Sequence, residues 1–311
     1  MDRPKGARVS RDWQDGHWTS ADGLRLHYRD YPGRSDRPPI LCIPGLTRNA
    51  RDFEPVADCF GGEWRIISVN LRGRGDSDYA KESASYTPAQ YVADIAALLD
   101  QVSLGSVVAI GTSLGGIVAM LLAAQDSAAV AALVLNDIGP EIEEAGLARI
   151  RDYVGQGRSY ATWMHAARAL REQAGEAHPD FVLADWLTLA KRLMCLGGSG
   201  RITFDYDMKI AEPFAQPLSQ SSSRAGSRSP LDPPLAQPVP DLWAALRSLT
   251  GRPVLALRGE LSDLLSVQTL ARMQTELPGL EAVTVPRTGH VPTLEEPAAQ
   301  AAIARLLAQV A

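Results

Sequence analysis

The sequence predicts an α/β fold in which helices cover both faces of a mostly parallel sheet. Short apolar runs rich in β-branched residues alternate with segments of helical periodicity along most of the 311 residues. Alternation of this kind is typical of strands joined by crossover helices. A Gly-rich turn at 111–116 joins one such strand directly to a helical run. These observations together predict the fold class.

Seven runs have the composition of strands, and helical segments separate most of them. The strands are expected at 24–31, 40–43, 65–70, 107–110, 131–136, 254–257 and 282–285. In the helix expected at 88–102, Tyr91, Ile95 and Leu98 recur at helical spacing. Short turns join the first strands, so these are expected to pair antiparallel. A last helix is expected at 298–310.

The alternation stops in the middle of the chain, where helical segments follow one another without intervening strands. We therefore expect an inserted helical module at 138–240 and a core formed by 1–137 and 241–311. Within the insertion, 217–240 is rich in serine and proline and poor in apolar residues. Such a segment buries too little surface to offset its ordering entropy, so we expect a mobile loop there.

The turn at 111–116 has the pattern G-x-S-x-G between a strand and a helix, which is typical of a nucleophile elbow. Gly111 and Gly115 have a steric reason, because side chains there would collide with the backbone of neighbouring elements in so tight a turn. The turn would hold the hydroxyl of Ser113 at the carboxyl edge of the sheet. Ser113 is therefore the candidate nucleophile.

A serine nucleophile needs a base to take its proton and an acid to orient that base. His290 lies in a loop between a strand-like run and the last helix, which suits the base. Asp263 follows the strand at 254–257 and is the preferred acid, because the order Ser, Asp, His is one of the known triad orders. Asp137 ends the strand at 131–136 and is the alternative acid.

These residues, with two further motifs, resemble the α/β-hydrolase fold superfamily over nearly the whole chain, and specifically its esterase-like members with a helical cap. Residues 40–46, ILCIPGL, resemble the strand and oxyanion loop of that family, and 70–78, NLRGRGDSD, resemble its next Gly-rich turn. Pro44 stands where many members have histidine. The resemblance implies an eight-stranded sheet, identifies the insertion as the cap, and implies that the Leu46 and Leu114 amides form an oxyanion hole.

The expected reaction is hydrolysis of a carboxylic ester of a small, largely apolar substrate through an acyl-enzyme, without a cofactor or metal. Open alternatives are a carbon–carbon bond hydrolase acting on meta-cleavage products, an enol-lactone hydrolase, and a hydrolase-fold receptor for a small ligand. Most aromatic side chains of the insertion are expected in its own core, with some turned toward Ser113. The candidate substrate contacts are Arg48, Trp163, Trp186 and Phe204.

Composition narrows the partners that we expect. The net charge of −5 offers no basic surface for nucleic acid, and no apolar stretch is long enough to span a membrane. The first residues lack an apolar signal region, and Cys42, Cys59 and Cys195 lack metal-ligand spacing. We therefore expect a cytoplasmic protein whose partners are a small ester and water.

Overall fold

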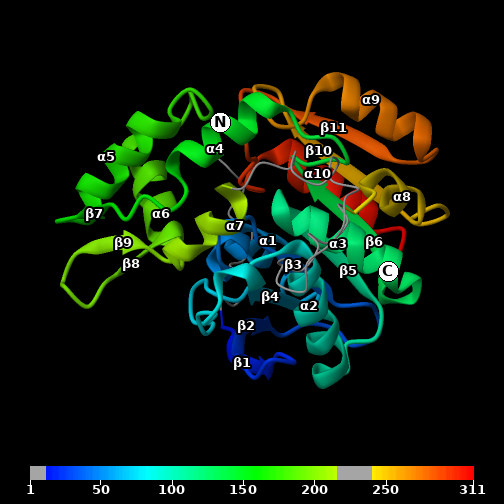
Figure 1. Cartoon of the computed structure of the whole chain (residues 1–311). Helices are drawn as coiled ribbons and strands as arrows, with labels where there is room; N and C mark the ends of the chain where they lie inside the picture. Colours follow the sequence, from blue (N-terminus) through cyan, green and yellow to red (C-terminus); the bar gives the residue numbers. More distant parts are fainter. Residues whose placement is uncertain (1–11, 216–239) are drawn as a thin grey trace, which may run out of the picture.

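The computed structural model describes residues 12–215 and 240–311, so the loop expected at 217–240 lies almost wholly outside the described residues. A central sheet of eight strands has the order β1-β2-β4-β3-β5-β6-β10-β11 (Figure 1). Pairing is antiparallel for β1 with β2 and for β2 with β4, and parallel elsewhere, as expected. The strands are β1 Gln14–Thr19, β2 Arg25–Tyr31, β3 Ile40–Ile43, β4 Ile66–Asn70, β5 Val107–Thr112, β6 Val130–Asn136, β10 Val254–Gly259 and β11 Glu281–Val285.

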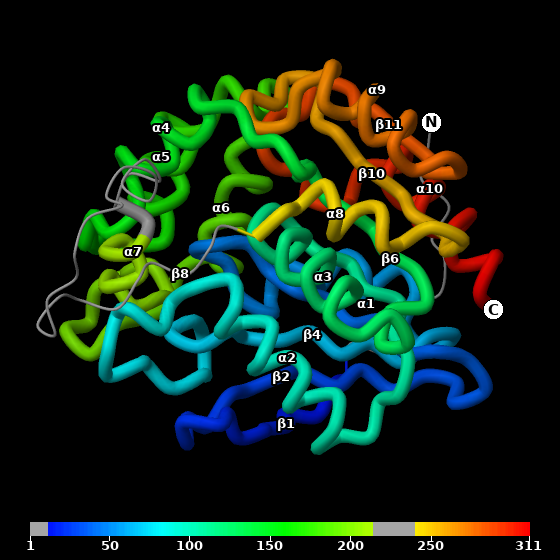
Figure 2. Tube along the Cα trace, turned by 45° about the vertical axis from the view of Figure 1, so that its right-hand side comes forward, coloured from blue at the N-terminus to red at the C-terminus, as the bar shows by residue number. Residues whose placement is uncertain are grey.

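Helices cover both faces of this sheet, which confirms the expected layers. Successive strand residues alternate between two hydrophobic clusters: Leu41 packs on the face of α2, α3, α8 and α9, and Cys42 packs on the face of α1 and α10. Figure 2 shows α2, α3 and α8 side by side along the sheet. The helices are α1 Glu54–Phe60, α2 Pro88–Val102, α3 Leu114–Gln125, α8 Leu242–Arg247, α9 Val267–Glu276 and α10 Pro297–Leu307.

The insertion between β6 and α8 lies to one side of the sheet (Figure 1), and we call its described residues 141–215 the cap segment. Its helices are α4 Glu144–Tyr153, α5 Trp163–Ala174, α6 Leu183–Leu193 and α7 Ala211–Ala215. The expectation of helices without strands is wrong here. The short strands β7 Ser159–Tyr160, β8 Met194–Leu196 and β9 Ile202–Phe204 form an antiparallel sheet in the order β7-β9-β8. Strands of two or three residues are too short to show an alternating pattern.

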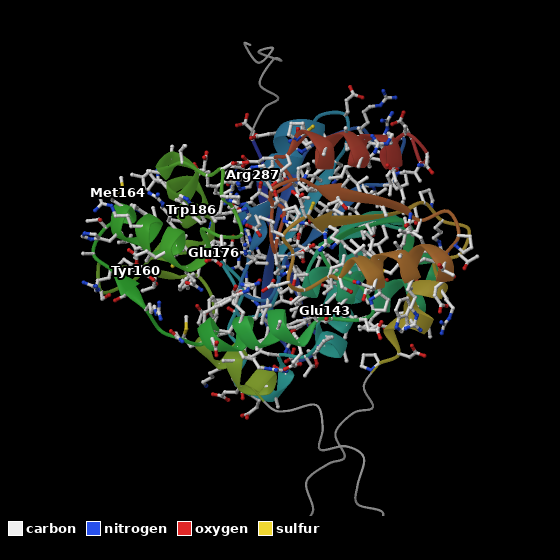
Figure 3. The ribbon with its side chains drawn as sticks, turned by 90° about the horizontal axis from the view of Figure 1, so that it is seen from above. Glu143, Tyr160, Met164, Glu176, Trp186 and Arg287 are labelled. Carbon is white, nitrogen blue, oxygen red and sulfur yellow. The ribbon has the colours of Figure 1, made fainter. Side chains whose placement is uncertain are left out.

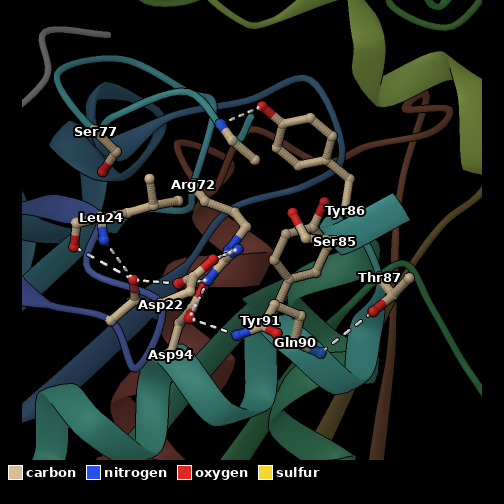
Figure 4. A network of polar contacts seen from close by, with 12 residues as sticks. Asp22, Leu24, Arg72, Ser77, Ser85, Tyr86, Thr87, Gln90, Tyr91 and Asp94 are labelled. Carbon is tan, nitrogen blue, oxygen red and sulfur yellow. Dashed lines mark hydrogen bonds and ion pairs between the residues drawn. The ribbon is translucent and has the colours of Figure 1, made fainter. Parts of the chain in front are cut away.

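The turn after β4 is fastened by a buried cation (Figure 4). The side chain of Arg72 has no exposed area and donates to both oxygens of Asp94, on α2, and of Asp22, in the turn after β1. These hydrogen bonds outweigh the effect of burial and hold the pKa of Asp22 at about 2. Three segments that are distant in sequence are thereby joined beneath the Gly-rich turn.

Candidate active site

The candidate residues gather at one edge of the sheet because neighbouring parallel strands end there. Ser113 follows β5, and Asp137 follows β6, which lies directly beside β5. β10 pairs with the other side of β6, and His290 lies in the loop after β11. The carboxyl edge of a parallel sheet is the usual place for a site in an α/β fold. The sheet thus brings one hydroxyl, one carboxylate and one imidazole together.

Ser113 has a backbone conformation that side chains rarely adopt, with φ 50° and ψ −117°. The neighbouring glycines explain how the turn closes. A Cβ at Gly111 would lie 2.5 Å from the Gly115 carbonyl oxygen, and one at Gly115 would lie 2.0 Å from the Ile43 carbonyl oxygen. The predicted steric reason for both glycines is confirmed. The turn leaves Ser113 partly exposed at the carboxyl edge of the sheet.

A continuous line of hydrogen bonds links Ser113, His290 and Asp137. Ser113 Oγ lies 3.1 Å from His290 Nε2, and Asp137 Oδ2 lies 2.7 Å from His290 Nδ1. With the proton on Nδ1, the imidazole donates to the carboxylate and accepts from the hydroxyl. Because a neutral imidazole accepts through one nitrogen only, this tautomer leaves Nε2 able to take the serine proton.

Asp137 is fully buried, and each of its oxygens has a partner. The Gly259 N–H donates to Oδ1 at 2.9 Å, and the Ser262 hydroxyl donates to Oδ2 at 2.7 Å. The Asp137 backbone has a positive φ of 56°, and its own N–H donates to the Leu257 carbonyl oxygen. Sequence reasoning missed Gly259 and Ser262 as partners of the carboxylate.

The preference for Asp263 as the acid does not agree with this geometry. The Asp263 carboxylate receives two hydrogen bonds from Arg149 on α4, at 2.6 and 2.8 Å. Burial raises the pKa of Asp263, but the Arg149 guanidinium outweighs it, so the pKa lies below its usual value. The partners of the two carboxylates explain the difference, since Asp137, directly after β6, contacts His290, whereas Asp263, in the loop after β10, is bound to Arg149.

The loop after β3 approaches Ser113 closely, as the oxyanion-hole expectation requires. A Cβ at Gly45 would lie 3.6 Å from the Ser113 Cβ, so the following residue, Leu46, lies beside the turn. The fully buried Arg74 donates from Nε to the Leu46 carbonyl oxygen at 3.0 Å and so holds the backbone directly after the Leu46 N–H. Leu114 is the first residue of α3, where backbone N–H groups have no partner within the helix.

The cap segment touches the loop that carries His290. The Gly289 N–H donates to the Ala177 carbonyl oxygen at 2.6 Å, and Arg287 Nε donates to Asp180 at 2.6 Å. His178 is buried between these contacts, and its pKa is lowered to about 4, first by burial and then by the positive charge of Arg48. At neutral pH the His178 imidazole is therefore uncharged.

The four candidate substrate contacts lie in different places. Trp186 is buried in the hydrophobic cluster of the cap segment, where Figure 3 shows it among the cap helices, and Trp163 packs against that cluster. Phe204 lies where the cap cluster meets the main core. Trp186 is thus a core residue and not a pocket wall. Arg48 is half-buried beside Gly45 and donates to Asp52 at 3.1 Å.

The described residues contain neither a metal-ligand cluster nor a membrane-spanning helix. Within 12–215 and 240–311, no three histidine, cysteine or acidic side chains come together as metal ligands. No helix in the same part of the chain has the length and apolar character needed to cross a membrane. All three cysteines are unpaired.

Several known proteins resemble this chain over most of its length. Residues 40–303 match the α/β hydrolase family. The 3-hydroxybutyrate-oligomer hydrolase of Cupriavidus necator is 31% identical over 286 residues, which cover 90% of this chain and 91% of that protein. The 2-(acetamidomethylene)succinate hydrolase of Mesorhizobium japonicum is 28% identical over 253 residues, which cover 81% of each chain.

A solved structure of higher sequence identity is also that of an α/β hydrolase. An α/β hydrolase from Novosphingobium aromaticivorans superimposes with a TM-score of 0.87 and 55% identity, covering 97% of this chain and all of that one. The sequence resemblance, the sheet topology and these likenesses agree over nearly the full length. The chain belongs to the α/β hydrolase family of enzymes.

Proposed function

We propose that this hydrolase cleaves carboxylic esters through a triad of Ser113, His290 and Asp137. The observation that carries the proposal is the hydrogen-bond line from Ser113 Oγ through His290 to Asp137, with distances of 3.1 and 2.7 Å. Asp137 replaces Asp263 as the acid, because Asp263 is bound to Arg149. The partly exposed Ser113 hydroxyl and the buried Asp137 carboxylate suit a nucleophile and an orienting group.

In the first step Ser113 Oγ attacks the ester carbonyl carbon while His290 Nε2 takes the hydroxyl proton. The Leu46 and Leu114 N–H groups donate to the negative oxygen that forms, and the start of α3 adds a favourable dipole. Asp137 stabilises the imidazolium. As the carbonyl re-forms, the ester C–O bond breaks and His290 gives its proton to the departing alcohol. The acyl group remains on Ser113.

In the second step water replaces the alcohol. His290 takes a proton from the water molecule, whose oxygen attacks the acyl carbon, and the same two amides bind the oxyanion. The bond from the acyl carbon to Ser113 Oγ then breaks, and the proton returns to Oγ. The enzyme is restored and the acid is released, with no cofactor taking part.

For the substrate, we propose a short oligoester of a hydroxy acid. The support is the 3-hydroxybutyrate-oligomer hydrolase, a relative that matches this chain over nine-tenths of its length. Ester bonds join the units of such an oligomer, and each unit is small and largely apolar. This agrees with the substrate class that the sequence predicts. A cytoplasmic setting is part of the proposal, because Cys42, Cys59 and Cys195 are all unpaired.

The test measures turnover of a substrate panel by the wild type and by Ser113→Ala. The panel holds dimers and trimers of 3-hydroxybutyrate, p-nitrophenyl esters of increasing acyl length, an enol lactone, a vinylogous diketone and 2-(acetamidomethylene)succinate. We expect esters to be the best substrates. Ser113→Ala should stay folded and lose at least about four orders of magnitude in kcat.

Three results would contradict the proposal. Turnover of the diketone or the succinate derivative in preference to every ester would reassign the reaction. Wild-type ester turnover that survives in Ser113→Ala would remove Ser113 as the nucleophile. Tight binding of a panel member without turnover would favour a receptor.

A further inference from the structure

The hydroxyl of Ser262 touches the buried carboxylate of Asp137 from the loop after β10. Ser262 Oγ lies 2.7 Å from Asp137 Oδ2, the same oxygen that accepts from His290 Nδ1. The Leu264 and Leu265 N–H groups donate to Ser262 Oγ at 3.2 and 3.1 Å. A hydroxyl has two lone pairs and one proton. Because two N–H donors occupy the lone pairs, the proton of Ser262 can go only to Asp137.

This arrangement gives the carboxylate a fixed orientation. Oδ1 accepts from the Gly259 N–H at 2.9 Å, and Oδ2 accepts from Ser262 and from His290. Both Gly259 and Ser262 belong to the end of β10 and its loop, whereas Asp137 follows β6. The neighbouring strand therefore supplies two of the three donors that hold the acid in place. Rotation of the carboxylate would break all three hydrogen bonds.

We propose that Ser262 is a positioning residue for the triad, acting through Asp137 on the orientation and proton affinity of His290. The inference rests on the triad of the proposed function. The same loop carries Asp263, the acid that the sequence favoured. Here the adjacent Asp263 is bound to Arg149, and the loop supplies instead a hydroxyl whose proton can point in one direction only.

The change that tests the proposal is Ser262→Ala. The carboxylate then loses one donor, so its negative charge is less stabilised and the Asp137–His290 pair holds a proton more tightly. A protonated imidazole cannot accept the serine proton. We therefore expect the acid side of the pH–rate profile to move to higher pH by about one unit, because a hydrogen bond to a charged group changes such an equilibrium about ten-fold.

Other charged and titratable groups near the pair stay unchanged in this variant. Arg149 and Asp263 face it from α4 and the β10 loop, and His178 faces it from the cap segment. His178 is uncharged near neutral pH, since its pKa is about 4. A shift of the acid side near neutral pH is then due to the lost hydroxyl. We also expect KM to stay within about two-fold while kcat falls.

The experiment measures the rate at which a fluorophosphonate labels Ser113 at a series of pH values. Mass spectrometry of the intact protein detects the label. The Ser113 oxygen bonds to phosphorus, the phosphorus–fluorine bond breaks, fluoride leaves, and His290 takes the hydroxyl proton. Labelling needs an activated serine but no natural substrate. Ester turnover is measured in parallel, so that a wrong substrate class does not affect the result for Ser262.

Two variants serve as controls, and thermal unfolding followed by circular dichroism checks that each is folded. Ser262→Thr keeps the hydroxyl and should restore the wild-type profile. Ser266→Ala is the matched control in the same loop, because Ser266 Oγ accepts from the Thr269 N–H at 3.1 Å and caps α9 without touching Asp137. We expect it to lower stability without moving the profile.

The proposal is overturned if Ser262→Ala keeps the wild-type profile, if Ser262→Thr behaves like Ser262→Ala, or if Ser266→Ala moves the profile equally. If wild type labels at Ser113 but hydrolyses no ester, the proposed substrate class fails, and the shift in labelling still decides the role of Ser262. If the wild type does not label at all, both proposals fail.

Discussion

Replacing Asp137 with asparagine probes the acid of the proposed triad without changing its shape. Asparagine has one acceptor oxygen and one NH2 group in place of the two carboxylate oxygens. In the wild type, Oδ1 accepts from the Gly259 N–H at 2.9 Å, while Oδ2 accepts from Ser262 and from His290 Nδ1, both at 2.7 Å. The new side-chain amide therefore has two possible orientations, with its NH2 group in the place of either Oδ1 or Oδ2.

The two choices differ in free energy. An NH2 group in the place of Oδ1 would face the Gly259 N–H, which the backbone fixes, and leave donors unsatisfied in a buried site, which costs about 1–3 kcal/mol. An NH2 group in the place of Oδ2 would face the Ser262 hydroxyl, which can turn its proton away by giving up one of the longer hydrogen bonds from the Leu264 and Leu265 N–H groups, at 3.2 and 3.1 Å. We therefore expect the NH2 group in the place of Oδ2, where it donates to His290 Nδ1. That nitrogen must then be unprotonated, so the proton moves to Nε2. In this tautomer, His290 can no longer accept the proton of Ser113.

The expected loss in kcat/KM is about four orders of magnitude, or about 5 kcal/mol of transition-state stabilisation, as for a wrong histidine tautomer in a serine triad. Initial rates with p-nitrophenyl butyrate at mildly alkaline pH measure it, and circular dichroism checks the fold. Retention of more than about one-tenth of the wild-type kcat/KM would refute the tautomer argument.

Asp263→Asn is the matched control for Asp137→Asn, because it makes the same chemical change in the loop after the neighbouring strand β10. The Asp263 and Arg149 side chains are 35% and 41% exposed, so losing part of their ion pair should cost at most about 1 kcal/mol. We expect kcat/KM to stay within about five-fold of the wild type. A loss of several orders of magnitude here, with a mild effect of Asp137→Asn, would make Asp263 the acid.

Two further predictions concern stability. Gly115→Ala should lower the free energy of unfolding by more than about 3 kcal/mol in urea titration, because the new Cβ would lie 2.0 Å from a backbone oxygen. Gly157→Ala is the control, because a Cβ at Gly157 would have no neighbouring atom within 4 Å, and it should change the free energy of unfolding by less than about 0.5 kcal/mol. If both variants lost the same free energy of unfolding, the steric explanation for Gly115 would be wrong. Arg72→Met leaves the Asp94 side chain, 1% exposed, without its cation and should cost about 3–5 kcal/mol (Figure 4). Adding Asp94→Leu to Arg72→Met should recover most of that loss. If Arg72→Met alone were as stable as the wild type, the role given to the buried cation would be wrong.

The strand pattern was readable wherever strands are buried on both faces. The run at 40–43 coincides with β3, and the helix expected at 88–102 coincides with α2, because apolar side chains at regular spacing mark buried elements. β1 Gln14–Thr19 is absent from the seven expected runs, since most of its residues are exposed and it lies at the sheet edge. A half-exposed edge strand has too few apolar positions to show its period.

The nucleophile turn could be predicted because its constraints are local. Gly111, Ser113 and Gly115 meet steric demands set by residues within one turn of chain and by the adjacent strand. The partners of the candidate acid could not be predicted in this way. Ser262 is an ordinary loop serine in the sequence, and only the pairing of β6 with β10 brings it to Asp137.

By itself, the sequence determined the fold class, the turn that carries Ser113 and the histidine that meets it, because hydrophobic period and backbone sterics act over short stretches of chain. Only the tertiary structure shows that Asp137 contacts His290 and that Asp263 does not take this position. Both follow apolar strands, and strand order within a sheet leaves no trace in local composition. The structure places β6 beside β5 and lets Arg149, from the cap segment, bind the other carboxylate.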